Sequence, residues 1–89
     1  MAIQRNNQGA ALEKAGKLPE AFEKYQQASG LDPDHTGIRL NLAMALLRLG
    51  QRNRGIVQLR EILRRDPENL AAKKALDQAL AQAPPETSR

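Results

Sequence analysis

The chain has 89 residues and a net charge of +4, which suits one small domain. It lacks cysteine, which excludes a disulfide framework and a thiolate metal site. With one Phe, one Tyr and no Trp, any core must consist mainly of Leu, Ile and Ala. No apolar run approaches the roughly 18 residues that span a membrane, and the start of the chain lacks the apolar segment of a signal peptide. These features leave the compartment open and favour a cytoplasmic location.

Apolar residues recur at helical spacing in five successive segments. Gly16 and Gly50 are expected to end helices, and the Asp-Pro pairs at 32–33 and 66–67 are expected to break the chain, because proline disfavours helix at the residue before it. The predicted helices cover residues 3–15, 19–30, 36–49, 53–65 and 68–82. Thr36 is the predicted N-cap of the third helix.

Each helix after the first has a predicted buried face. The second buries Phe22 and Tyr25, and the third and fourth bury Leu and Ile residues that include Leu46 and Leu59. In the fifth helix the expected inward residues are Leu70, Leu76 and Leu80. Its expected outward residues, which would form a polar cap, are Lys73, Lys74, Asp77, Gln78 and Gln82.

The sequence repeats itself with a period of 34 residues: Gly50 matches Gly16, and Asp66-Pro67 matches Asp32-Pro33. A period of this length indicates a helical-repeat architecture. The prediction is an all-α fold, an α-solenoid of antiparallel helix pairs with about five helices. The predicted domain covers residues 1–83, with repeats at about 2–35 and 36–69 and a capping helix at 70–82. Residues 84–89 are predicted to be a flexible tail or linker.

The residues at this period resemble the tetratricopeptide repeat (TPR). Gly9, Leu12, Gly16, Ala21, Tyr25, Ala28 and Pro33 fit the first repeat, and Leu42, Ala43, Leu46, Gly50, Gly55, Leu59, Ile62 and Pro67 fit the second. The resemblance implies a right-handed superhelix whose first helices line a concave groove. It also implies a non-catalytic module, without a cofactor, that holds a peptide or helix of a partner protein.

The resemblance places seven partner-binding residues in that groove: Asn7, Leu40, Asn41, Met44, Leu47, Arg48 and Lys74. Asn7 and Asn41 are one repeat apart, and their side-chain amides could bond to a peptide backbone or could simply be solvated. The stripe of Leu40, Met44 and Leu47 is expected either to face outward as a contact site or to pack on a neighbouring repeat.

Three other functions are weighed against partner binding: an enzyme, a nucleic-acid-binding surface and a structural module. His35 is the only histidine, so the sequence offers neither a metal site nor a nucleophile with its base, and an enzyme is not expected. The positive charge is concentrated in residues 39–89, and a basic surface that binds nucleic acid is therefore an alternative, although the prediction disfavours it. A structural module that self-associates into a homo-oligomer, or docks within a larger protein, is another.

Overall fold

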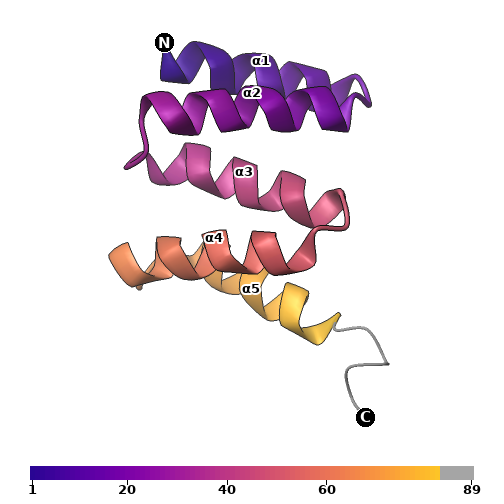
Figure 1. Ribbon diagram of the computed structural model, residues 1–89. Coiled ribbons are helices and arrows are strands. Elements are labelled where there is room, and N and C mark those ends of the chain that lie inside the picture. The colour runs from indigo at the N-terminus through magenta and orange to yellow at the C-terminus, as the bar shows by residue number, and fades with distance from the viewer. Residues whose placement is uncertain (83–89) are drawn as a thin grey trace.

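The computed structural model describes residues 1–82, which form five helices stacked in chain order (Figure 1). The helices are α1 (Ala2–Lys14), α2 (Leu18–Leu31), α3 (Thr36–Arg48), α4 (Arg52–Arg65) and α5 (Leu70–Ala81). The described part of the chain contains no strand, and the predicted all-α helical-repeat fold is confirmed. None of these helices has the length and apolar character needed to cross a bilayer. The predicted tail at 84–89 lies outside the described residues.

The two predicted glycine stops end α1 and α3 in the same way. Gly16 has a φ of 80° and Gly50 a φ of 82°, values that glycine adopts without the steric cost of a Cβ atom. The amide after each glycine donates back into the helix, from Lys17 to the Leu12 carbonyl and from Gln51 to the Leu46 carbonyl, both at 2.9 Å. These bonds belong to Schellman motifs, which satisfy carbonyls that the helix end would otherwise expose.

The helix starts correct the sequence prediction at two places. His35, not Thr36, caps α3, because its Nδ1 accepts a hydrogen bond from the Ile38 amide at 3.1 Å. One period later Asn69 caps α5, where its side-chain oxygen accepts from the Ala72 amide at 2.9 Å. The fifth helix therefore begins at Leu70 rather than near residue 68, since a cap residue itself stays outside the helix.

The core consists of two clusters that share α3. On one side of α3, Leu42, Ala45 and Leu46 pack with Ala21 and Tyr25 of α2. On the other side, the cluster joins α3, α4 and α5 through Ala43, Leu59, Ile62, Ala72 and Ala75. Because α3 belongs to both clusters, it fixes the position of the first helix pair relative to α4 and α5.

Two predictions about buried side chains are wrong. In α5 the buried residues are Ala72, Ala75 and Ala79, whereas Leu70 and Leu80 are exposed and Leu76 is half-buried against the core. The residues predicted to face outward are all exposed, namely Lys73, Lys74, Asp77, Gln78 and Gln82. Because Leu70 and Leu80 are exposed as well, the outward side of α5 is only partly polar within residues 1–82. Phe22 of α2 is only half-buried, and the Arg54 guanidinium lies 5.8 Å from its ring centre.

Candidate functional site

A hollow of about 370 Å³ lies between α3 and α5, and is called the α3–α5 hollow below. Its lining residues are Met44, Leu47, Arg48, Ala75, Gln78, Ala79 and Gln82. Alanine and the two larger apolar side chains provide an apolar surface, while arginine and the glutamines supply hydrogen-bond donors and acceptors. This combination of an apolar surface with a few polar groups is what small binding sites generally contain.

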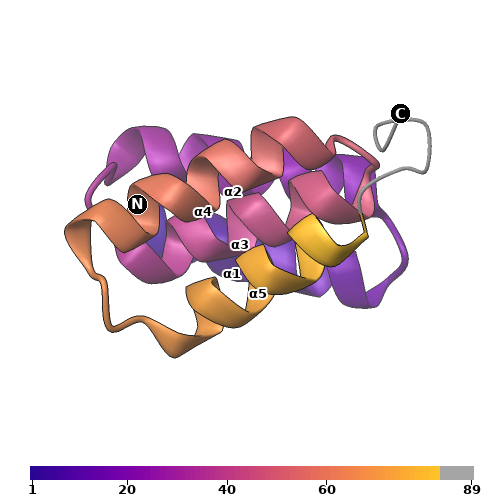
Figure 2. The same cartoon turned by 90° about the horizontal axis from the view of Figure 1, so that it is seen from below.

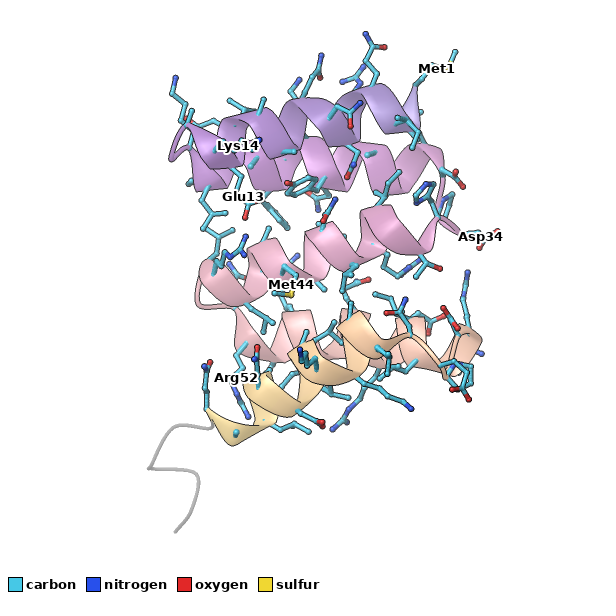
Figure 3. All side chains as sticks on the ribbon, turned by 180° about the vertical axis from the view of Figure 1, so that it is seen from behind. Met1, Glu13, Lys14, Asp34, Met44 and Arg52 are labelled. Carbon is cyan, nitrogen blue, oxygen red and sulfur yellow. The ribbon has the colours of Figure 1, made fainter. Side chains whose placement is uncertain are left out.

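A second hollow of about 400 Å³ lies where α1, α2 and α3 meet, and is called the α1–α3 hollow below. It is lined by Ala10, Glu13, Lys14, Tyr25 and Asn41. Both hollows involve α3. In Figure 3 the labelled Glu13 side chain points from α1 toward α3, and Met44 lies between α3 and α5.

Glu13 connects the two hollows through charge and hydrogen bonding. The Tyr25 hydroxyl donates to the Glu13 carboxylate at 2.7 Å, and Arg48 of α3 forms an ion pair with the same carboxylate. Burial raises the pKa of Tyr25, so its hydroxyl keeps its proton and acts as a donor. The Asn41 amide donates to the Asn6 side-chain oxygen at 2.9 Å, which adds a second polar link between α1 and α3.

Arg52 fixes the end of α5 beside the α3–α5 hollow. Its Nε donates to the Ala79 carbonyl at 2.9 Å. That carbonyl belongs to the last turn of α5, whose carbonyls have no partner within the helix. Arg52 lies at the start of α4, near the C-terminal end of α5 in Figure 3. The hydrogen bond therefore holds the wall formed by Ala79 and Gln82 against α4.

A comparison of the sequence with family models identifies the repeat. The model of the tetratricopeptide repeat matches residues 12–79, which is more than half of the chain. The chain belongs to the tetratricopeptide repeat family. Tetratricopeptide repeats generally mediate protein–protein interactions and are typically non-catalytic. A search of curated proteins finds no match to this chain.

The tetratricopeptide repeat fold brings together four of the seven predicted groove residues. Met44, Leu47 and Arg48 line the α3–α5 hollow, and Asn41 lines the α1–α3 hollow. The other three lie outside both hollows. Asn7 is exposed on α1, Leu40 is half-buried against the core, and Lys74 lies with Leu70 and Asp77 on a different side of α5. A partner-binding role for any of the seven stays a prediction.

The expected outward stripe of Leu40, Met44 and Leu47 is largely a packing surface. All three are half-buried and contact the cluster that joins α3, α4 and α5. Leu40 therefore packs on a neighbouring repeat, which is one of the two alternatives that the sequence leaves open. Met44 and Leu47 have both roles, because they pack on the cluster and also line the α3–α5 hollow.

Eight lining residues are not among the seven predicted partner-binding residues: Ala10, Glu13, Lys14, Tyr25, Ala75, Gln78, Ala79 and Gln82. The sequence does contain a signal for the α5 part of the wall. Ala75, Gln78, Ala79 and Gln82 follow the spacing i, i+3, i+4, i+7, which places them along one side of a helix. No sequence pattern indicates the contacts of Glu13 with Tyr25 and Arg48, because they depend on where these three residues lie in space.

Two of the five arginines of α4, Arg64 and Arg65, are paired with carboxylates. Glu61 accepts hydrogen bonds from Arg64 at 2.6 Å and from Arg65 at 2.9 Å, and Arg65 also pairs with Asp34. Hydrogen bonds from Arg64 and Arg65 lower the pKa of Glu61 from 4.5 to about 2. These ion pairs are at the surface, where each stabilises the fold only slightly. They do reduce the charge that α4 offers to a polyanion.

Proposed function

We propose that this tetratricopeptide repeat domain binds an extended segment of a partner protein along the side that carries the α1–α3 and α3–α5 hollows. The observation that supports this most directly is the α3–α5 hollow, which combines an apolar surface with the polar ends of Arg48, Gln78 and Gln82. An apolar side chain of the partner would occupy this hollow. The adaptable thioether of Met44 suits contact with varied apolar groups.

The polar groups around the two hollows suit the backbone of the same segment. Side-chain amides both donate and accept, which matches the alternating groups of an extended chain. Asn41 already uses one amide donor on Asn6, and its oxygen and second N–H are left for a ligand. In this proposal Asn41 and Gln78 bond to the partner's backbone, while the apolar hollow selects the side chain.

The test is a selection of displayed random peptides against the immobilised domain, followed by affinity measurements on variants. We expect the Gln78→Ala variant and the Asn41→Ala/Met44→Ala variant to weaken binding by about tenfold or more, the effect of losing about 1.4 kcal/mol. Arg60→Ala is the control, because Arg60 is exposed on α4 and lines neither hollow. Peptides that bind all variants equally well would contradict the proposal, provided that circular dichroism shows each variant folded.

The nucleic-acid alternative stays a prediction, and two features of the described residues count against it. Glu61 pairs with Arg64 and Arg65, and Glu13 pairs with Arg48. Tyr25 is buried and the Phe22 ring lies beside Arg54, so neither offers an open face on which a base could stack.

A further inference from the structure

The free face of α5 combines two exposed leucines with two opposite charges. Leu70, Lys73, Asp77 and Leu80 follow the spacing i, i+3, i+7, i+10 and therefore lie along one side of the helix. Leu70 is 75% exposed and Leu80 is 42% exposed. Within residues 1–82, neither Lys73 nor Asp77 forms a salt bridge. These four residues are called the outer face of α5 below. Viewed from below, α4 and α5 are the helices nearest the viewer (Figure 2).

One period earlier in the sequence, the face of α3 that corresponds to the outer face of α5 is covered by α4. Ala43 and Leu46 of α3 occupy the positions of Asp77 and Leu80 one period earlier, and both are buried. At this point α4 crosses α3 closely: a Cβ atom added to Gly55 would lie 3.2 Å from the Ala43 carbonyl oxygen. In the first repeat the equivalent residue is Gly9, which is buried against Tyr25 of α2.

Asp77 therefore stands where the complete repeats have a small residue at a close helix crossing. A helix that covered α5 as α4 covers α3 would bury the Asp77 carboxylate. Burying an unpaired carboxylate is strongly unfavourable, and the occupant of this face must place a cation against it. The exposed leucines require in addition that the occupant be apolar on either side of that cation.

A second copy of α5 meets both requirements. If two α5 helices pack antiparallel through their outer faces, about a two-fold axis midway between Lys73 and Asp77, Leu70 lies opposite Leu80 of the second copy. Lys73 then lies opposite Asp77 of the second copy, and both pairs occur twice because the contact is symmetric. We propose that this chain self-associates through the outer face of α5 in this antiparallel, two-fold arrangement. The contact uses a side of α5 other than the wall formed by Ala75, Gln78, Ala79 and Gln82, so it is independent of the binding function proposed above.

The size of α5 sets the strength of this contact. Its 12 residues span about 18 Å, so the two helices bury less than the roughly 1,200 Å² typical of a stable interface. The dimer is therefore expected to be weak, with a dissociation constant of about 10 to 1,000 µM. The leucine pairs supply the apolar burial, and the charge pairs set the antiparallel orientation.

Sedimentation velocity of the full chain, from about 5 to about 500 µM, tests the proposal. We expect wild type to shift from monomer toward dimer across this range. Lys73→Asp places like charges opposite each other in the symmetric dimer, and Asp77→Lys does the same, so each single variant should stay monomeric. An equimolar mixture of the two should associate, because every facing pair in the heterodimer then has opposite charges. The double variant Lys73→Asp/Asp77→Lys should associate as wild type does.

Glu23→Lys is the matched control, because Glu23 is exposed on α2 and its charge reversal should leave association unchanged. Circular dichroism of each variant would show that the fold is retained. Three results would overturn the proposal: a wild type that stays monomeric throughout the range, single variants that dimerise as wild type does, or a mixture of the single variants that fails to associate while wild type dimerises.

Discussion

Replacing Gly9 with alanine tests a close contact between α1 and α2. A Cβ atom at this position would lie 2.7 Å from Cε1 and 2.8 Å from Cδ1 of Tyr25, and 3.2 Å from the Ala21 carbonyl oxygen. The Tyr25 ring has little room to move, because it is 2% exposed and its hydroxyl is bonded to Glu13. One of the two helices must therefore shift to accept a single methyl group.

Two effects of opposite sign decide the magnitude. Alanine gains about 1 kcal/mol over glycine in a helix interior, whereas overpacking a tight contact costs about 1–3 kcal/mol. Because backbone and a held ring both crowd the site, we expect the cost to be larger and the Gly9→Ala variant to lose about 1–2 kcal/mol of unfolding free energy. For a domain of this size that loss lowers the Tm by about 5–15 °C.

Two further glycines in helices serve as comparisons. At Gly55 an added Cβ atom would lie 2.7 Å from Cδ2 and 2.9 Å from Cγ of Leu47, and 3.2 Å from the Ala43 carbonyl oxygen, but Leu47 lines the α3–α5 hollow and can turn into it. Gly55→Ala should therefore lose only about 0–1 kcal/mol, less than Gly9→Ala, because the helix gain of about 1 kcal/mol offsets most of a smaller overpacking cost. Gly30 has no atom within 4 Å of an added Cβ, so Gly30→Ala should stabilise the domain by about 0.5–1 kcal/mol.

Thermal unfolding followed by far-ultraviolet circular dichroism is the assay. The expected order of Tm is Gly30→Ala above Gly55→Ala, with Gly9→Ala lowest. If Gly9→Ala raised the Tm as much as Gly30→Ala does, the close approach of α1 to Tyr25 would be refuted. Urea titration of the same variants gives an independent free energy, and an unchanged slope would show that the unfolded state is the same.

The remaining predictions concern the core and the surface charges. Leu59→Ala should cost about 2–5 kcal/mol, because Leu59 is fully buried, whereas Val57→Ala at an exposed position of the same helix should change stability by less than about 0.5 kcal/mol; urea unfolding checks both. Glu61→Gln should lower the Tm slightly at neutral pH. Since the pKa of Glu61 falls from 4.5 to about 2 on folding, its stabilisation is complete above pH 4.5 and disappears as the pH approaches 2. A Tm difference that persists at pH 2, or that does not shrink in high salt, would contradict this origin.

The helix boundaries were largely readable from the sequence because they depend on local backbone preferences. Gly16 and Gly50 adopt positive φ values that other residues avoid, and the Asp-Pro pairs prevent the preceding helices from continuing. The start of α3 was less predictable. His35 and Thr36 both have side chains that can accept a hydrogen bond, and only the position of the Ile38 amide shows that His35 makes it.

The buried face of α5 could not be predicted from the sequence. Its leucines and its alanines each follow a helical spacing, and the sequence predicts that the larger leucines form the core. Packing against α3 and α4 instead buries the small residues Ala72, Ala75 and Ala79. Small side chains allow helices to approach closely, and the bulkier Leu70 and Leu80 are left outside.

The sequence alone determined that this chain is a helical repeat, because a 34-residue period of turn residues and apolar positions acts through local backbone geometry and burial. The tertiary structure alone decided which of the predicted groove residues lie together. Arg48 reaches Glu13 and Asn41 reaches Asn6 only because α3 packs across the first helix pair. These contacts join residues 35 positions apart, and their formation depends on the angle between helices, which no local pattern encodes.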